Sequence, residues 1–439
     1  MLRRTTFLHL CVLAVIVSAS SVALAQSFTS ADRGTAQDML NNAYNEVRKH
    51  YYDPNIHGLD WEGIVAATKE KIKTATTYPQ AISLVAAALD KIDDSHTFLL
   101  PPVHAVRLDY GWEHAAFGNQ CLIVRVRPGT DAEKKLKPGD EILTINGLPA
   151  ARQNLWRLHY MFDTLRPQPG LHLEVKSPDG AVRQVDVVAK TRQTTKVRDL
   201  GNASDFGDYY RTYEADDKRF RVRYAEFGDD LVIAYVPEFN FSEAEVDRMV
   251  GKARKHKALI IDLRGNYGGS ELSLRLLVAG FLDKEVKIAD RIAREDRYRK
   301  PVIARHRSDP FTGKLIILVD SRSASAAELF AREMQIEKRG TVLGDLTSGM
   351  VMEAVYFGFQ AGAGTVTPYG LSITRADLIM SDGKSLEKRG VTPDEYMVPT
   401  AEDLSKSWDT VLSHAAEEAG VKLSPADAFK LFPYEWPPE

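Results

Sequence analysis

The chain has 439 residues, of which 44% are hydrophobic and 27% charged, and its formal net charge at pH 7 is −3. This length exceeds what one ordinary hydrophobic core holds, so we expect two or three domains. The near-neutral charge argues against a nucleic-acid partner and against a polybasic membrane-binding surface.

The N-terminus has the pattern of an export signal. Arg3 and Arg4 supply positive charge, an apolar run extends from Phe7 to about Val17, and Ala23-Leu24-Ala25 is a small-x-small cleavage site. We therefore predict a signal peptide over residues 1–25, cleaved after Ala25, and a periplasmic or secreted protein with no stable membrane insertion. A transmembrane anchor is the alternative, for which the apolar run is short.

Removal of this signal would leave Cys121 as the only cysteine. No internal disulfide would then be possible, and no zinc-type spacing of Cys and His is present in the sequence. We accordingly expect neither a metal nor a cofactor.

The residues after the signal, from Ser30 to about Asp93, are predicted to be helical. Their apolar positions recur with helical spacing, as in Leu40, Ala43, Tyr44, Val47 and Tyr51. Tyr51-Tyr52-Asp53-Pro54 ends the first helix because the residue before a proline disfavours the helical conformation. Asp60-Trp61 begins the second helix.

Residues from about Asp109 to Lys190 show short strands and turns instead. Lys137-Pro138-Gly139-Asp140, followed by a strand and Asn146-Gly147, resembles the pattern of a PDZ domain, a module that binds extended chains by strand addition. Tyr110-Gly111-Trp112-Glu113 replaces the usual carboxylate-binding loop. A structural module that only packs on the rest of the protein is the alternative.

The remaining chain alternates between strands and helices. After a polar linker and an edge hairpin over residues 191–229, apolar strands and amphipathic helices follow each other from Leu231 to about Met397, which predicts an α/β core. The tail from Ala401 to Glu439 is predicted to be helical up to about Lys430.

Two segments of this core carry most of the functional information. Asp262-Leu-Arg-Gly-Asn-Tyr-Gly-Gly269 follows one buried strand, and Ser323-Ala-Ser-Ala-Ala-Glu328 follows another and begins a helix. A turn of small residues at a helix N-terminus exposes a serine hydroxyl and free backbone N–H groups, which are two requirements of acyl-transfer chemistry.

Together with Glu387-Lys-Arg-Gly-Val-Thr-Pro-Asp394, these segments resemble the serine peptidases that include the C-terminal processing (tail-specific) proteases and the core of tricorn protease. The resemblance extends from about Ser30 to Thr400. It implies a mixed α/β (α+β) fold with a helical N-terminal domain (26–105), a PDZ-like β-rich domain (106–192), a crotonase-like ββα-type peptidase core (193–400) and a C-terminal helical tail (401–439).

The family has two catalytic solutions, and the residues present favour one of them. In the Ser–Lys dyad branch the serine directly precedes the glutamate of the turn and the lysine lies in a later loop; here those positions hold Ala327 and Met350. In the tricorn-like branch a Ser–His–Glu set is used. Its positions match Ser325, His96 and Glu387, in the family's order.

The resemblance assigns Ser325 as nucleophile, His96 as general base and acid, and Glu387 as the orienting carboxylate, with Ser95 as an auxiliary hydroxyl in the His–Glu relay. Such an arrangement makes chemical sense because a serine hydroxyl needs a base, and the base needs a fixed tautomer. The oxyanion hole would be the N–H of Ala326 with an N–H of Gly268 or Gly269.

Alternatives remain for several of these residues. Ser323 competes with Ser325 for the nucleophile, and His104 is the strongest rival histidine because it is close to His96 in the sequence. Lys338 and Lys388 could supply a lysine base if the alignment slips. Glu328 is better explained by a structural role in the first turn of its helix. Asp262 and Arg264 are expected to brace the Gly-rich loop as an ion pair.

The sequence thus predicts a serine endopeptidase that acts on unfolded or extended polypeptides. A non-catalytic binding protein on the same scaffold, similar to the interphotoreceptor retinoid-binding proteins, and a PDZ-type adaptor are the alternatives; the complete Ser–His–Glu set favours the peptidase. Substrate preference and oligomeric state are not encoded in any recognisable pattern.

Overall fold

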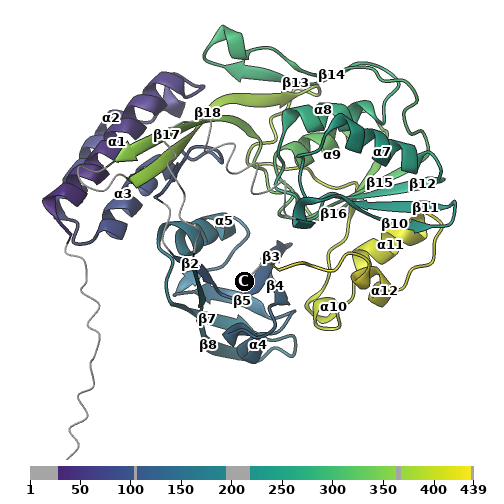
Figure 1. Ribbon diagram of the computed structural model, residues 1–439, viewed down its shortest axis with the longest axis horizontal. Helices are drawn as coiled ribbons and strands as arrows, with labels where there is room; N and C mark the ends of the chain where they lie inside the picture. The colour runs from purple at the N-terminus through teal and green to yellow at the C-terminus, as the bar shows by residue number, and fades with distance from the viewer. Residues whose placement is uncertain (1–27, 103–105, 194–217, 362–366, 437–439) are drawn as a thin grey trace, which may run out of the picture.

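The computed structural model describes residues 28–102, 106–193, 218–361 and 367–436 (Figure 1). The predicted signal peptide, His104 and most of the predicted linker lie outside these ranges. Within them, no helix combines the length and the apolar character needed to span a bilayer.

The N-terminal helices form as predicted. The chain folds there into α1 (Ser30–His50), α2 (Trp61–Thr74) and α3 (Tyr78–Asp90). Thr29 caps α1 in a capping box with Asp32, and Asp60 caps α2, so the side chains near each start satisfy backbone N–H groups. Helix α1 packs on a long hairpin of strands, β17 and β18, while α2 and α3 pack on α1 and on each other (Figure 1).

This hairpin belongs to an antiparallel sheet that the sequence pattern did not predict. Its strand order is β1-β18-β13-β14, with β17 also paired to β18. The strands are β1 (Phe98–Leu100), β13 (Val286–Ala293), β14 (Val302–Ala304), β17 (Met352–Ala361) and β18 (Thr367–Met380). Because β1 pairs with β18, the short segment between α3 and β1 is held against the C-terminal half of the chain.

The segment from Val106 to Gln193 forms a β-rich module around its own apolar core. Its main sheet has the order β3-β4-β5-β7-β8, so β3 is an edge strand. The elements are β2 (Val106–Asp109), β3 (Trp112–Phe117), β4 (Gln120–Val126), α4 (Asp131–Lys135), β5 (Glu141–Ile145), β6 (Leu148–Pro149), α5 (Leu155–His159), β7 (Gly170–Lys176), β8 (Val182–Val188) and β9 (Lys190–Gln193).

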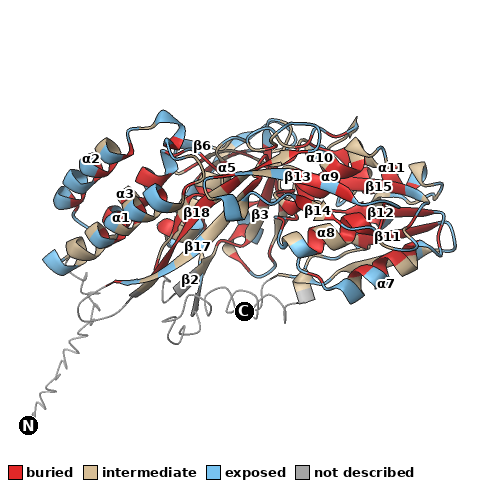
Figure 2. Cartoon of the chain, turned by 90° about the horizontal axis from the view of Figure 1, so that it is seen from above, coloured by how far each residue is buried: buried red, intermediate tan, exposed pale blue. Residues whose placement is uncertain are grey.

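The predicted α/β core is a six-stranded sheet of order β10-β11-β12-β15-β16-β19, in which β10 is antiparallel and the other strands are parallel. The elements are β10 (Arg223–Phe227), β11 (Leu231–Tyr235), α7 (Glu243–Ala253), β12 (Ala258–Asp262), α8 (Glu271–Ala279), β15 (Lys314–Val319), α9 (Ala326–Ile336), β16 (Thr341–Gly344) and β19 (Glu395–Tyr396). The central strands are buried on both faces, as Figure 2 shows, which explains their continuous apolar sequence.

The tail consists of three short helices rather than one long one. They are α10 (Ala401–Ser405), α11 (Thr410–Glu418) and α12 (Pro425–Lys430). Helices α11 and α12 cover the face of the central sheet opposite α7, α8 and α9, while Leu404 of α10 packs on the β-rich module (Figure 1). The tail therefore contacts both the central sheet and the module.

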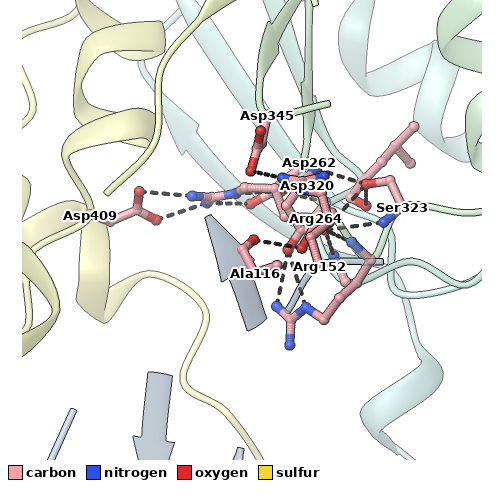
Figure 3. A network of polar contacts seen from close by, with 12 residues as sticks. Ala116, Arg152, Asp262, Arg264, Asp320, Ser323, Asp345 and Asp409 are labelled. Atoms are coloured by element: carbon pink, nitrogen blue, oxygen red, sulfur yellow. Dashed lines mark hydrogen bonds and ion pairs between the residues drawn. The ribbon is translucent and has the colours of Figure 1, made fainter. Parts of the chain in front are cut away.

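Three neighbouring parallel strands end in an aspartate at the same edge of the sheet. Asp262 and Asp409 both accept hydrogen bonds from Arg264, which is the predicted brace of the Gly-rich loop (Figure 3). Asp320 binds the guanidinium of Arg322 and the N–H of Gly265. Asp345, the aspartate after β16, binds Arg152 of the β-rich module, so this edge also fixes the module against the core.

That third contact joins Asp345, after β16, to Arg152 (Figure 3). The N–H of Gly118 donates to the same carboxylate at 2.9 Å, and the hydroxyl of Ser321 donates to the carbonyl of Ala116 in β3 at 2.6 Å. The edge strand β3 thus lies directly against the turn that precedes α9. Carboxyl ends of parallel strands are where α/β proteins place their sites.

Candidate active site

In the turn between β15 and α9, the two candidate nucleophiles, Ser323 and Ser325, have different surroundings. Ser323 is buried, its hydroxyl donates to the carbonyl of Leu263 at 2.8 Å, and its Oγ accepts the N–H of Asp320. Ser325 is half-buried and has φ 53° and ψ −117°. A non-glycine residue in the positive-φ region stores strain that is common at functional sites. Among the described residues, the Ser325 hydroxyl donates to no acceptor.

The strained turn is held by a buried carboxylate. Both oxygens of Glu328 accept hydrogen bonds: from the hydroxyl of Thr347 and the N–H of Gly349, and from the N–H groups of Met350 and Ser325, the last two at 3.0 Å. Burial raises the pKa of Glu328 to about 7, although these donors oppose the shift. Glu328 therefore joins the serine turn to the loop after β16, which extends the structural role expected for it.

His96 lies between α3 and β1 and is connected to Glu387 through one hydroxyl. The Oγ of Ser95 is 2.7 Å from Nδ1 of His96 and donates to Oε2 of Glu387 at 2.8 Å; the Ser95 N–H donates to Oε1 at 2.9 Å. A hydroxyl has one proton, so if Ser95 gives it to the carboxylate, its oxygen accepts the Nδ1–H of His96. This tautomer leaves Nε2 unprotonated and able to accept a proton.

The protonation of these two groups follows from their burial. Burial lowers the pKa of His96 and thereby favours the neutral imidazole, while the nearby charge of Asp94 partly opposes the shift. Burial raises the pKa of Glu387, whereas the hydrogen bonds that its carboxylate accepts from Ser95 and from the N–H of Val351 lower it.

Residues 350 and 351 link the serine turn to this relay. The N–H of Ser325 donates to the carbonyl of Met350 at 3.1 Å, and the next N–H, that of Val351, donates to Oε2 of Glu387 at 2.9 Å. The backbone of Met350 and Val351 therefore connects the Ser325 turn to Glu387 of the relay, although the segments that carry them are far apart in the sequence. Met350, at the lysine position of the dyad, contributes its backbone to this link.

The Gly-rich loop lies against the same turn. A Cβ on Gly268, which has φ 98°, would be 2.7 Å from Cβ of Ser325 and 3.0 Å from the nitrogen of Ala326. The N–H of Gly268 donates to Oδ1 of Asn266 at 2.8 Å. By contrast, the N–H groups of Gly269 and Ala326 have no hydrogen-bond partner within the described ranges, so both can bind an external acceptor.

The alternative candidates for the nucleophile and the base lie in other surroundings, as far as the structure describes them. Ala327 is fully buried. Lys388 is exposed and forms an ion pair with Asp93. Lys338 follows the C-terminal end of α9, at the far end of that helix from Ser325. His104 lies outside the described residues.

Sequence signals did not point to every residue around the site. Asp94 is buried and accepts hydrogen bonds from the N–H groups of His96 and Thr97 and from the hydroxyl of Thr374. It precedes Ser95-His96 directly, and an aspartate in a loop favours an Asx turn with the backbone N–H two residues later, which is the signal that could have identified it.

The chain is similar in sequence to known peptidases. Residues 232–397 match the model of peptidase family S41, and residues 33–78 match the tricorn protease C1 domain. The chain is 27% identical to the tail-specific protease of Haemophilus influenzae over 329 residues, which cover 69% of this chain and 43% of the relative. It is 24% identical to the chloroplastic carboxyl-terminal-processing peptidase 1 of Arabidopsis thaliana, covering 86% of this chain and 72% of that protein.

Solved structures agree with the fold. The mature CPAF protein, solved with lactacystin, superposes with a TM-score of 0.64 at 15% identity, covering 86% of this chain and 96% of that one. The photosystem II D1 C-terminal processing protease superposes with a TM-score of 0.54 at 18% identity, covering 91% and 100%. The solved structures show the fold, while the family models and the related sequences support the tail-specific protease family and a serine-type peptidase.

Proposed function

We propose that the protein is an endopeptidase that hydrolyses unfolded or extended polypeptides through a Ser–His–Glu set. Ser325 is the nucleophile, His96 the base and acid, and Glu387 the carboxylate that acts on His96 through Ser95. The observation that carries this proposal is the continuous hydrogen-bonded relay from Glu387 through Ser95 to Nδ1 of His96.

In the proposed reaction, Nε2 of His96 removes the proton of the Ser325 hydroxyl while Oγ attacks the scissile carbonyl carbon. The imidazolium that forms is stabilised by Glu387 through the Ser95 hydroxyl. It then gives its proton to the leaving amine, and the acyl-enzyme is released when a water attacks the ester with the same base. The Ser325 proton thus leaves on the amine, and a proton of the attacking water passes through Nε2 of His96 to Oγ of Ser325, so both side chains end as they began.

The negative oxygen of the tetrahedral intermediate needs hydrogen-bond donors. We assign these to the N–H groups of Ala326 and Gly269, because Gly268 already donates to Asn266. The assignment chooses between the two glycines that sequence reasoning left open.

The division into the helical segment, β-rich module, core and tail at the predicted boundaries is part of this proposal, as are the PDZ-like nature of the module and a periplasmic or secreted location. The edge strand β3 supports the PDZ-like reading because strand addition needs an unpaired edge. The polypeptide substrate is inferred from the family and from the names of the relatives.

The deciding experiment is labelling of the purified protein with a fluorophosphonate, together with casein turnover, for wild type, Ser325→Ala and Ser323→Ala. We expect both signals to be lost in Ser325→Ala alone, whereas Ser323→Ala keeps labelling and loses stability because its hydroxyl bonds are buried. Loss in Ser323→Ala with retention in Ser325→Ala would refute the nucleophile. A folded wild type without labelling or turnover would favour the binding-protein alternative.

A further inference from the structure

The tail segment of residues 432–436 lies between the central sheet and the β-rich module. On the core side, the ring of Phe432 stacks on Tyr235 with centroids 5.6 Å apart, and Arg223 donates to the carbonyl of Pro433 at 2.8 Å. The following residues, Tyr434 and Trp436, contact the module instead, so this segment bridges the two parts of the protein.

The module receives these two aromatic side chains with one carboxylate and two guanidinium groups. The Tyr434 hydroxyl donates to Oε1 of Glu113 at 2.8 Å, and the Arg125 guanidinium lies 4.4 Å from the Tyr434 ring centroid. The guanidinium of Arg127 lies 5.7 Å from the ring of Trp436. Cations over aromatic faces and a phenol bonded to a carboxylate recognise aromatic residues specifically.

The receiving residues are built into the sheet. Glu113 on β3 is directly opposite Arg125 on β4, and Arg127 donates its N–H to the carbonyl of Gly111. The two aromatic rings meet edge to face, with centroids 5.0 Å apart and an angle of 86° between them. Burial and the Glu113 carboxylate raise the pKa of Tyr434, so its hydroxyl remains a donor.

The bound segment is held loosely compared with the rest of the fold. None of residues 432–436 is fully buried, although Phe432, Tyr434 and Trp436 are half-buried, and none of the five forms a backbone–backbone hydrogen bond with another described residue. Its attachment consists of the ring contacts and two hydrogen bonds. Segments with few buried contacts and no backbone ladder open at low free-energy cost, so another polypeptide can replace this one.

The site also lies close to the catalytic turn. Glu113 is on the same strand as Ala116, whose carbonyl accepts the hydroxyl of Ser321 at 2.6 Å. Ser321 and Arg322 precede Ser325 in the turn, and the charges of Glu113 and Arg322 interact. Occupancy of the site therefore bears on the strand that supports the nucleophile.

We propose that Glu113, Arg125 and Arg127 form a binding site for a polypeptide segment with two aromatic side chains two residues apart. Tyr434 and Trp436 of the protein's own tail are its resident occupant, and a substrate segment of the same kind displaces them. The site itself stands on the contacts above; only its use by substrates rests on the proposed function.

The test measures binding of a fluorescent peptide with the sequence of residues 430–436 to full-length protein carrying Ser325→Ala, so that nothing is cleaved. The comparison is between this protein and one that also carries Tyr434→Ser and Trp436→Ser. A tethered tail competes at an effective concentration on the order of millimolar. We therefore expect the peptide to bind the doubly substituted protein at least about tenfold more tightly.

Three controls make the comparison specific. Adding Arg125→Met to the doubly substituted protein should weaken binding again, and a peptide with serine at both aromatic positions should not bind. Trp408→Ser changes a partly exposed tail tryptophan that lies over Lys406 and should behave like the unsubstituted protein. Thermal unfolding verifies that each variant folds; Tyr434→Phe, which keeps the ring and removes the bond to Glu113, serves as the mild substitute and should bind the peptide with intermediate affinity.

Equal affinity of the two proteins for the peptide would overturn the proposal that Tyr434 and Trp436 occupy the site. No peptide binding by a folded, doubly substituted protein would overturn the proposal that the site exists. With Ser325 restored, the same double substitution should lower KM for substrates containing the aromatic pair and leave KM for a substrate without it unchanged; an unchanged KM for both overturns displacement by substrates. Peptide binding without any turnover would refute the proposed peptidase function and leave the site intact.

Discussion

The hydroxyl of Ser95 joins His96 to Glu387, at 2.7 Å from Nδ1 and 2.8 Å from Oε2. The carboxylate thus reaches the imidazole through a neighbouring side chain, and among the described contacts no direct hydrogen bond connects the two. Such a relay fixes the imidazole tautomer with two hydrogen bonds in series, and its efficiency depends on the hydroxyl that connects them.

Replacing Ser95 by alanine should therefore reduce kcat much more than it changes KM. The carboxylate would lose its connection to the ring, and the Nδ1 proton would lose its acceptor. We expect a decrease of roughly 10²-fold, smaller than for Ser325→Ala, because the positioned base still contributes. Steady-state kinetics with a fluorogenic peptide measure the change. Ser95→Thr, which retains a hydroxyl, should recover part of the rate.

An exposed serine is the matched control for this series. Ser405→Ala on α10 removes a hydroxyl whose one hydrogen bond to another described residue is to the carbonyl of Glu402, and it should leave kcat and KM unchanged. If Ser95→Ala retained the full wild-type kcat, the relay would not be part of the mechanism.

The acidic limb of the pH–activity profile should lie below about pH 6.5, which is the usual pKa of a histidine side chain. The proposed base must be neutral to act, and burial lowers the pKa of His96, so the active form should persist to lower pH. Asp94 opposes this shift through its charge, so Asp94→Asn should move the limb to still lower pH. Values of kcat/KM, determined from initial rates between pH 4 and 9, test both statements. An acidic limb that moves to higher pH in Asp94→Asn would contradict the assignment of His96 as the base.

Gly268→Ala should nearly abolish activity. The added methyl would stand 2.7 Å from Cβ of Ser325 in a residue whose φ is 98°, so the loop or the serine turn must move. We expect kcat to fall by about 10²-fold or more, because both the proposed nucleophile and the proposed oxyanion donors would be displaced. The turnover assay gives the measurement, with circular dichroism to verify folding.

A second glycine provides the control. Gly251 lies within α7, and an added Cβ there would meet nothing within 4 Å. Gly251→Ala should stabilise the protein by about 0.5–1 kcal/mol and leave the kinetics unchanged. Normal activity in Gly268→Ala would show that the Gly-rich loop is not next to the reacting atoms.

The sequence predicted those parts of the structure whose signals are local. The strands before the Gly-rich loop and the serine turn are continuous apolar runs, and α9 begins at Ala326 as expected. The helices from Ser30 to Asp90 follow from apolar spacing and capping residues.

The parts that were missed depend on contacts between distant residues. The β17–β18 hairpin has intermediate and exposed positions along one strand and packs against α1, so its sequence pattern alone does not identify it. Likewise, the bonds of Ser321 to Ala116 and of Arg152 to Asp345 join segments far apart in the chain. No single-sequence pattern specifies which polar side chains meet across such an interface.

The buried carboxyl of Glu333 on α9 gives the last prediction, which concerns stability. The residue has no solvent exposure, and within the described ranges neither carboxyl oxygen has a hydrogen-bond partner. Burial and the charge of Glu337 raise its pKa to about 7. The folded protein therefore prefers the protonated acid, whereas the unfolded chain ionises near pH 4.5.

Because the folded-state pKa is the higher one, this contribution to stability is fully present below about pH 4.5 and is lost as the pH rises through about 7. At about 1.4 kcal/mol per pKa unit, the loss is on the order of 3 kcal/mol. Glu333→Gln cannot ionise, so urea unfolding at pH 5 and pH 8 should show a smaller decrease for this variant than for its parent, both in the Ser325→Ala background.

Glu328, whose pKa is also raised to about 7, contributes equally to Glu333→Gln and to its parent. The slope here is the change in unfolding free energy between pH 5 and pH 8, and the difference between the slopes of the two proteins isolates Glu333. The exposed Glu417→Gln on α11 should keep the slope of the parent. Equal slopes for Glu333→Gln and the parent would mean that Glu333 stays ionised in the folded protein, with a compensating cation or water next to it.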